Sequence, residues 1–371
     1  MRPTLSSTIA IAHRPERIRS RKEYNGLPAC EYHGLCTFGG CHADAKGSTN
    51  SAPIPQAERT GNLKVVEHAR VIEIVVDGDG MAAGVRYVQG NAVHFQPAKA
   101  VLVAGYTYEN TRLLLLSKSA AFPHGLANNH GQVGKHYLAH VRAGANGVIP
   151  GHKLNRFSGT ASQWTAVDDW DSDFFDHAGL GFIGGGTMAA GMEAKPIAAA
   201  RTTPPTLPRW GSAWKAWLKQ NAISVASAAT QINVTPYEDA FLDLDPTAKD
   251  PHGVPVVRVT NDLRDNERRA ALFVQGKCVE WLREAGASET WLVAPNSLSI
   301  QTHAFGGTRM GGDPAGSVTD EWCFTHEVPN LGVLGASNFP TSGGRNPTET
   351  VMALAWRTAD HLVESWGARA A

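Results

Sequence analysis

The C-terminal part of the chain contains the pattern that most constrains the fold: a short apolar strand, a glycine- and proline-rich loop and an amphipathic helix, in that order. The apolar run is 331–336, and the loop covers 338–345. Apolar side chains then recur at helical spacing over 347–366, which predicts a helix with Asn346 as N-cap and Pro347 at its first position. Because helix N-termini stabilise negative charge, this pattern is typical of a site for an anionic ligand.

A strand that leads into a helix occurs a second time, between Asn62 and Ser119. Apolar runs separated by turn residues predict a β-meander with strands at 63–66, 71–76, 82–88 and 101–104 and a turn at 77–80. After Gly105, the spacing of apolar residues predicts a helix over 107–119. A strand followed at a glycine by a helix is the local pattern of a dinucleotide-binding sheet.

Residues 137–260 have a different character. Tryptophan, proline and glycine are scattered between short alternating runs such as 221–234 and 254–259, which predicts an antiparallel sheet with long loops. An amphipathic helix is predicted over 264–285, with Leu272, Val279 and Leu282 on its apolar side and Gly286 as its end. We interpret this region as a second, substrate-side domain.

Charge and hydropathy exclude several classes of function. The 371 residues include 34 Lys and Arg and 34 Asp and Glu, so no net charge attracts nucleic acid or an anionic membrane. The longest apolar runs are far shorter than the ~20 residues that cross a bilayer. Residues 1–20 also lack the apolar core of a signal peptide. We therefore expect no nucleic-acid partner, no membrane-spanning segment and no export signal in this sequence.

One histidine stands just before a glycine-rich loop at 303–312, and one asparagine precedes the last predicted helix. The imidazole of His303 takes up a proton near neutral pH, and the carboxamide of Asn346 donates or accepts a hydrogen bond. Such a pair is suited to deprotonating an alcohol while a hydride leaves its carbon. The structural alternative is that His303 caps a loop and Asn346 caps a helix. The residue types alone leave both interpretations open.

Three segments together resemble the C-terminal portion of the glucose–methanol–choline oxidoreductase family. The last of them runs from His303 through 333–345 to Asn346, Pro347 and Thr348. Residues 104–117 are similar to the family's strand-to-helix signature, and 131–140 are similar to the loop that follows it. The similarity is closest to the branch that contains gluconate, fructose and other sugar or polyol dehydrogenases.

This resemblance implies a fold and a division into domains. The implied fold is α/β, with an FAD-binding Rossmann-like part and an antiparallel-sheet substrate domain. The implied boundaries are 1–136 for part of the FAD-binding domain, 137–300 for the substrate domain, and 301–371 for the segment that completes the FAD-binding domain and the active site.

The resemblance also implies roles for individual residues. His303 is the implied catalytic base, and Asn346 hydrogen-bonds the substrate oxygen while the hydride passes to N5 of FAD. The implied substrate is an alcohol, sugar, polyol or sugar acid, and the implied electron acceptor is a cytochrome or quinone. The residues expected to bind the cofactor are Ala104, Gly105, Gly335, Ala336, Pro347 and Thr348.

The sequence departs from the family pattern in two places. Gly335 stands where many members carry an acidic residue. The G-x-G-x-x-G turn that binds the ADP part of FAD has no counterpart, because the glycines at 34–40 follow cysteines and not an apolar strand. We expect that piece on a separate N-terminal FAD-binding chain, or else the gene is a fragment or starts further upstream. The alternative function is a truncated or partner subunit that neither binds FAD nor catalyses alone.

A cysteine-rich segment offers a second cofactor hypothesis. Cys30, Cys36 and Cys41, with His33 among them, have the spacing of soft ligands that converge on an iron–sulfur cluster or zinc. The segment resembles a stretch that holds an iron–sulfur cluster in some related dehydrogenases. The alternative is three reduced structural cysteines near the flavin. Two further cysteines, Cys278 and Cys323, are expected to be packing residues.

Overall fold

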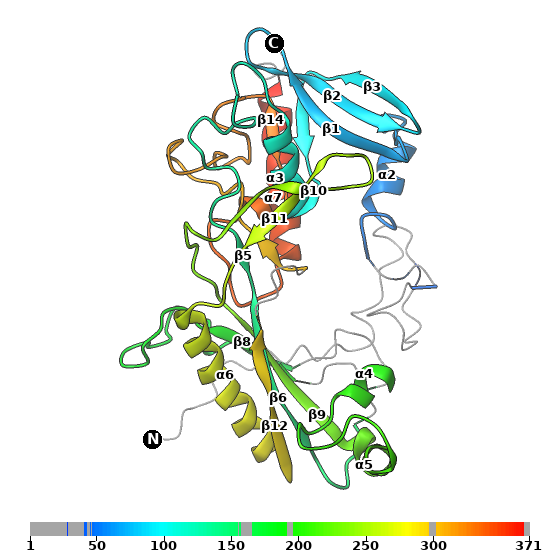
Figure 1. Ribbon diagram of the computed structural model, residues 1–371, viewed down its shortest axis with the longest axis vertical. Coiled ribbons are helices and arrows are strands. Elements are labelled where there is room, and N and C mark those ends of the chain that lie inside the picture. The colour runs from blue at the N-terminus through cyan, green and yellow to red at the C-terminus, as the bar shows by residue number, and fades with distance from the viewer. Residues whose placement is uncertain are drawn as a thin grey trace. The chain divides into compact units, whose positions relative to one another are not determined.

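The computed structural model describes residues 28, 41–42, 45, 47–154, 156, 165–190, 196–296 and 302–366 (Figure 1). The chain divides into two compact units. The first unit comprises residues 1–65, 142–232 and 268–296, and the second unit comprises 66–141, 233–267 and 297–371. Residues 233–267 thus group with the second unit, whereas the sequence placed them in the substrate domain. The domain boundaries inferred from the sequence stay a prediction.

The first unit is built on a five-stranded sheet with the strand order β12-β6-β9-β8-β7. The β12–β6, β9–β8 and β8–β7 pairs are antiparallel, which confirms the antiparallel sheet predicted for this part of the chain. The strands are β6 (Val141–Val148), β7 (Thr165–Val167), β8 (Gly186–Ala190), β9 (Val225–Ile232) and β12 (Glu289–Asn296). The helices are α2 (Pro53–Arg59), α4 (Pro196–Arg201), α5 (Ser212–Asn221), η2 (Ala222–Ser224) and most of α6 (Asp265–Glu284).

Helix α6 is joined to this sheet by a buried amide. The side chain of Gln275 donates from Nε2 to the carbonyl oxygens of Gly144 on β6, at 2.8 Å, and of Val293 on β12, at 2.5 Å. The predicted apolar side of the helix is wrong at Leu272, which is 51% exposed. Leu282 is buried as predicted, and the other buried apolar residues of the helix are Ala270, Ala271, Val274 and Cys278.

The second unit contains four small sheets in the described residues: β1-β2-β3, β10-β11, β13-β5 and β14-β4. The antiparallel strands are β1 (Ala69–Val76), β2 (Ala82–Gln89), β3 (Ala92–Pro97), β5 (Leu138–Ala139), β10 (Phe241–Lys249), β11 (Pro255–Thr260) and β13 (Ala304–Phe305). The parallel pair is β4 (Val101–Val103) with β14 (Leu331–Val333). The helices are α3 (Tyr106–Leu116), η3 (Ala336–Asn338) and α7 (Thr348–Glu364).

The β-meander differs from its prediction at both ends. The run 63–66 lies outside the strands, and the third strand is β3, which the sequence analysis missed. All six residues of β3 are exposed, and its apolar alternation is limited to Val93 and Phe95, which is too short a pattern to mark a strand clearly. The turn at 77–80 is confirmed, because the amide of Gly80 and the carbonyl of Met81 both bond to the backbone of Asp77.

Helix α7 begins one residue later than predicted. Its first residue is Thr348, and Pro347 occupies the cap position in place of Asn346. A shift of one residue is expected at helix ends, because proline's fixed φ suits both positions. The strand before it is also shorter than the predicted 331–336, since a 3₁₀ turn at Ala336–Asn338 follows β14 closely.

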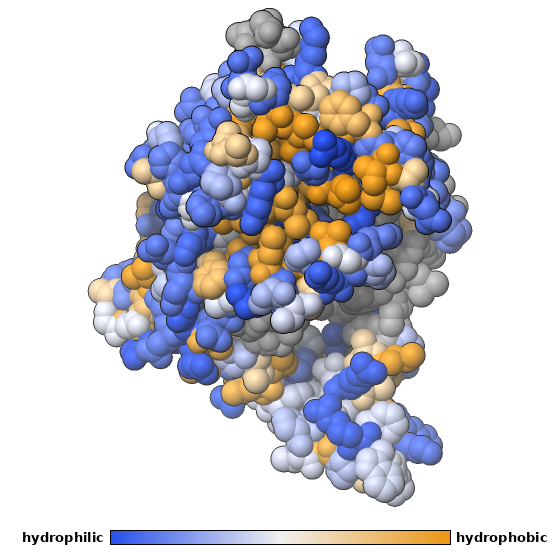
Figure 2. All heavy atoms as spheres, turned by 45° about the horizontal axis from the view of Figure 1, so that its top comes forward, coloured by the Kyte–Doolittle hydropathy of each residue, from blue (hydrophilic) through white to orange (hydrophobic). Residues whose placement is uncertain are grey.

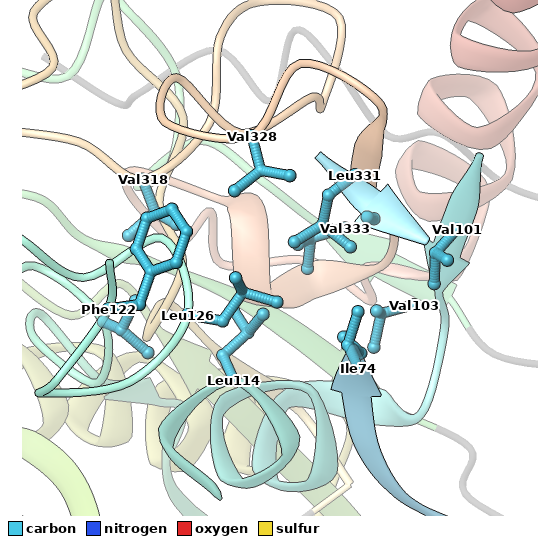
Figure 3. Close-up of a cluster of buried hydrophobic side chains, with 12 residues drawn as sticks. Ile74, Val101, Val103, Leu114, Phe122, Leu126, Val318, Val328, Leu331 and Val333 are labelled. Carbon is cyan, nitrogen blue, oxygen red and sulfur yellow. The ribbon is translucent and has the colours of Figure 1, made fainter. Parts of the chain in front are cut away.

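The core of the second unit lies around the parallel pair (Figure 3). The buried side chains of β4 and β14 meet those of Ile74 from β1 and Leu114 from α3; the strand residues in this cluster are Val101, Val103, Leu331 and Val333. The other buried members of this cluster are Ala82, Phe122, Leu126, Val133, Val318 and Val328. Burial of these apolar side chains holds together strands that are far apart in sequence.

Helix α7 also carries apolar side chains on a second side. Met352, Trp356 and Val363 are 56%, 69% and 78% exposed, while Thr358 on the opposite side is buried. Figure 2 shows a face of the molecule on which hydrophobic side chains gather. A helix that is packed along one side and apolar along another is typical of a surface that contacts further protein.

A buried asparagine fixes the start of the parallel pair. Asn330, 3% exposed, accepts a hydrogen bond at Oδ1 from the amide of Ala82, at 2.9 Å. Its Nδ2 donates to the carbonyl oxygens of Ala82, at 2.8 Å, and Lys99, at 2.9 Å. Its own carbonyl accepts from the amide of Val101. One side chain therefore joins β2, the residues before β4 and the start of β14.

We expect Asn330→Ala to lower the free energy of unfolding by roughly 2–3 kcal/mol, because it leaves the buried amide and carbonyl of Ala82 without partners. Chemical denaturation measures the change. The matched control is Asn91→Ala, which replaces an exposed asparagine and should stay within about 0.5 kcal/mol of the parent. Equal stability of the two variants would contradict this role for Asn330.

Candidate functional site

The carboxyl ends of β4 and β14 lie at the same edge of the sheet, because the two strands are parallel. Ala104 and Gly105 follow β4, and Gly335 and Ala336 follow β14. The sequence analysis expected these four residues to bind the cofactor. The structure brings the two pairs to one edge.

Asn110 joins the two strand ends. Its buried side chain accepts a hydrogen bond at Oδ1 from the amide of Gly105, at 2.6 Å. Its Nδ2 donates to the carbonyl oxygen of Leu334, at 2.8 Å, and to the hydroxyl of Ser337, at 2.9 Å. Residues 104–117 carried the family resemblance, yet no local signal distinguished Asn110 within them. Asn110 was therefore not predicted to position the site.

Gly335 has a backbone conformation that requires glycine. Its φ is 112°, outside the region that L-residues ordinarily adopt. A Cβ built there would meet no atom closer than Nδ2 of Asn110, at 4.0 Å, so the space beside the backbone is open. The glycine at this position is thus explained by the chain's conformation and by an accessible backbone.

His303 lies against a second, buried histidine. Because β13 pairs with β5 in antiparallel register, with Ala304 opposite Ala139, the next residues in line are His303 and His140. Their Nδ1 atoms are 3.0 Å apart, and Nε2 of His140 lies 2.5 Å from the carbonyl oxygen of Gly343. His140 is fully buried, whereas His303 is partly exposed. His140 was not among the site residues predicted from the sequence.

Asn346 follows the loop that Gly343 belongs to. The structure brings His303 beside His140, and through His140 beside Gly343, three residues before Asn346. Asn346 is exposed and precedes Pro347 at the start of α7. The direct pairing of His303 with Asn346 at a substrate stays a prediction.

The glycine-rich loop after His303 runs alongside η3. The amides of Gly306, Thr308 and Met310 donate to the carbonyl oxygens of Ala336, Ser337 and Asn338, at 3.2, 3.0 and 2.8 Å. The chain approaches its neighbours so closely that Gly306, with φ of 73°, has no room for a side chain. A Cβ there would lie 1.9 Å from the carbonyl oxygen of His136.

Tyrosine hydroxyls lie close to β13 and β5. The amide of Ala304 donates to the hydroxyl of Tyr106, at 3.2 Å, and the hydroxyls of Tyr108 and Tyr137 are 2.8 Å apart. Burial raises the pKa of Tyr106 to about 12, so its phenol stays protonated at neutral pH. Tyr106 has a positive φ of 74°, a conformation that is concentrated near functional sites.

The cysteine hypothesis falls mostly outside the described residues. Of Cys30, Cys36 and Cys41, only Cys41 is described, and it is partly exposed. Within the described ranges, no three His, Cys, Asp or Glu side chains are grouped to hold a metal ion. Cys278 and Cys323 are buried as expected, and burial raises the pKa of the Cys278 thiol to about 12. In the same ranges, every helix is too short or too polar to cross a bilayer.

We expect Gly306→Ala to lower the free energy of unfolding by about 2 kcal/mol or more, because the new methyl group overlaps a backbone carbonyl and the positive φ disfavours alanine. Gly312→Ala is the matched control in the same loop, since a Cβ at Gly312 meets nothing within 4 Å. Thermal unfolding compares the two variants. A Gly306→Ala protein as stable as the control would show that the loop does not make this close approach.

Comparison with known proteins identifies the family of the chain. Two models of the GMC oxidoreductase family match the chain, one over residues 18–142 and the other over 236–355. The chain is 30% identical over 348 residues to the gluconate 2-dehydrogenase flavoprotein of Pantoea cypripedii, covering 91% of this chain and 56% of that protein. It is 32% identical over 302 residues to 2-methyl-1,2-propanediol dehydrogenase of Mycolicibacterium austroafricanum, covering 80% and 53%.

The fold is shared with solved structures at low sequence identity. Formate oxidase from Aspergillus oryzae superposes with a TM-score of 0.60 at 12% identity, over 86% of this chain and 64% of that one. The chain spans about half the length of the curated relatives described above. The two family models together cover most of the sequence, including the strand ends at β4 and β14, the His303 loop and the start of α7. The chain is therefore a member of the GMC oxidoreductase family.

Proposed function

We propose that this chain carries the acid–base side and the flavin-facing side of an FAD-dependent oxidoreductase that acts on the CH–OH group of an alcohol, sugar, polyol or sugar acid. One observation carries the proposal beyond family membership. The loop that follows His303 is hydrogen-bonded to the segment that follows β14, from the amide of Gly306 to the carbonyl of Ala336. The proposed base and the proposed flavin contacts thus belong to one hydrogen-bonded structure.

The strand edge fits a flavin in its backbone exposure and in its electrostatics. Ala104 and Gly105 are exposed, and the space beside Gly335 is open, so a planar ring has access to the backbone. Helix α3 begins at this edge, and its N-terminus favours negatively charged groups. The residues proposed to hold FAD are Ala104, Gly105, Gly335, Ala336, Pro347 and Thr348. When bound, FAD supplies the hydride acceptor.

The chain's own residues would manage the proton and orient the substrate. In the proposal, the imidazole of His303 accepts the proton of the substrate hydroxyl, and the carboxamide of Asn346 hydrogen-bonds the same oxygen. The N-terminus of α7, at Thr348, would offset negative charge on a bound flavin, which is an electrostatic contribution of the oxyanion-hole kind.

The proposed substrate class follows from the names of the two relatives. One is named for gluconate, a sugar acid, and the other for a propanediol. Both are named dehydrogenases, so we propose an electron acceptor other than oxygen, such as a cytochrome or quinone. A panel of sugars, sugar acids and diols with an artificial dye as acceptor would identify the substrate class.

We expect the chain to retain FAD through gel filtration, either alone or mixed with a polypeptide that carries a G-x-G-x-x-G turn, and to show the absorption band of bound flavin. Gly335→Val should lose the flavin, because valine disfavours a φ of 112° and its side chain covers the exposed backbone. Gly312→Val is the matched control and should retain it. A colourless parent protein in both preparations would support the alternative of a partner subunit that does not bind FAD.

In the flavin-loaded protein, we expect His303→Gln to slow reduction of the flavin by substrate roughly 10²- to 10⁴-fold, the range for loss of a general base. The flavin content should not change. Stopped-flow absorbance measures the rate, and His124→Gln, which replaces an exposed histidine, is the control. Near-normal reduction by the His303→Gln protein would remove His303 from the reaction.

A further inference from the structure

A fully buried histidine stands behind the proposed base. His140 is 0% exposed, and its two ring nitrogens face different partners: Gly343 at Nε2 and His303 at Nδ1. The ring of Phe305 lies against it, with the ring centroids 4.9 Å apart. Both nitrogens of the buried imidazole therefore take part in short polar contacts.

The partners determine where the protons lie. A backbone carbonyl only accepts hydrogen bonds, so the 2.5 Å contact requires that Nε2 of His140 carries a proton and donates it to Gly343. In the neutral imidazole, Nδ1 is then the unprotonated nitrogen and an acceptor. The 3.0 Å contact between the two Nδ1 atoms is a hydrogen bond only if His303 donates to His140. His303 therefore carries its proton on Nδ1.

The opposite arrangement needs a buried charge. If His140 donated from Nδ1 as well, it would be a doubly protonated imidazolium with no exposed surface, and burial disfavours the charged form of histidine. The neutral chain of donors from His303 to His140 to Gly343 is the arrangement that these contacts favour.

We infer that His140 is a positioning residue that holds His303 in the Nδ1–H tautomer and so leaves Nε2 of His303 as the basic nitrogen. This inference rests on the proposed function, in which His303 accepts the substrate proton. After Nε2 has taken up that proton, Nδ1–H of His303 continues to donate to His140, so the contact stabilises the imidazolium. His140 does for His303, without a charge, what a buried carboxylate does for a catalytic histidine elsewhere.

The backbone supports the same geometry. The β5–β13 pair fixes His140 opposite His303, and the amide of His140 lies 3.5 Å from the carbonyl oxygen of His303. Next to the loop that carries Gly343, the hydroxyl of Ser342 accepts a hydrogen bond from the amide of Val234, at 2.9 Å. His303 and the residue before Gly343 are thus hydrogen-bonded to neighbouring chain segments, which restrains the positions of both partners of His140.

The test is NMR of the full chain with ¹⁵N-labelled histidine, at a pH about two units above the ordinary histidine pKa of ~6.5, so that the rings are neutral. Long-range ¹H–¹⁵N correlations identify which ring nitrogen carries the proton, and the spectrum of His303→Gln assigns the His303 signals. We expect His303 to appear as the Nδ1–H tautomer. Observation of the Nε2–H tautomer in the parent protein would overturn the inference, whatever the variants do.

Two substitutions at His140 separate tautomer control from packing. His140→Asn keeps an acceptor oxygen on the γ-branch, near the position of Nδ1, whereas His140→Leu fills similar space without an acceptor. We expect His303 to shift to the Nε2–H tautomer in the leucine variant and to remain Nδ1–H in the asparagine variant. Reduction of the flavin should slow roughly tenfold or more with leucine and recover with asparagine, by analogy with the loss of a group that orients a metal-binding histidine. An unchanged tautomer in a folded leucine variant would contradict the inference.

The outcomes distinguish this inference from the proposed function. If His303 is the Nδ1–H tautomer but His303→Gln reduces flavin normally, the hydrogen-bond chain stands and the role of His303 as base fails. If His303→Gln is inactive while the parent shows the Nε2–H tautomer, the base stands and the role of His140 fails. The tautomer of the parent chain is measured without bound flavin, so the result does not depend on activity.

Discussion

The parallel pairing of β4 with β14 is the interaction on which the rest of the second unit depends. It joins two strands that are far apart in sequence, and an asparagine lies at each end of the pair. Asn330 fixes the start of β14 to the residues around Ala82, and Asn110 fixes the residues that follow both strands. The apolar side chains between them exclude water, so these amide hydrogen bonds keep their strength.

A series of hydrogen bonds connects the candidate site to this pair of strands. η3 follows β14, and the glycine loop at 306–310 lies along η3 through three backbone hydrogen bonds. The same loop begins at β13, whose pairing with β5 puts His303 opposite His140. Each step uses backbone groups and glycines, since a Cβ at Gly306 would prevent the approach. The position of the proposed base is therefore a consequence of the sheet that carries the proposed flavin contacts.

The elements with strong local signals were predictable from the sequence. Apolar spacing predicted the helices α3, α6 and α7 to within a few residues, and the alternating Asp and Gly residues at 77–80 predicted the turn. Strand β3 was missed because Val93 and Phe95 give only a short apolar alternation. Leu272 was misplaced because the buried face of α6 is set by its contact with the sheet, through Gln275, and an apolar side chain such as Leu272 can lie outside that contact.

The missed residues of the site share one property. His140 follows a two-residue strand, and Asn110 lies in the middle of an ordinary helix, so nothing in their own neighbourhood distinguishes them. Apart from Gly105, which bonds to Asn110, the partners described above come from residues 303–343, and the pairings of β5 with β13 and of β4 with β14 bring these partners close. The 131–140 and 104–117 segments were recognised by resemblance, which selects motifs but does not show which side chains meet.

The central claim is that His303 and Asn346 act on one substrate at one face of a flavin held by the β4–β14 edge. A crystal structure of the chain with FAD bound, together with any polypeptide that its binding needs, tests this claim most directly. The flavin ring is expected to lie against Gly335 and Ala336. Nε2 of His303 and the carboxamide of Asn346 are expected on one face of the ring, the face from which the substrate approaches N5. A flavin bound elsewhere, or these two side chains directed into separate packed regions, would contradict it.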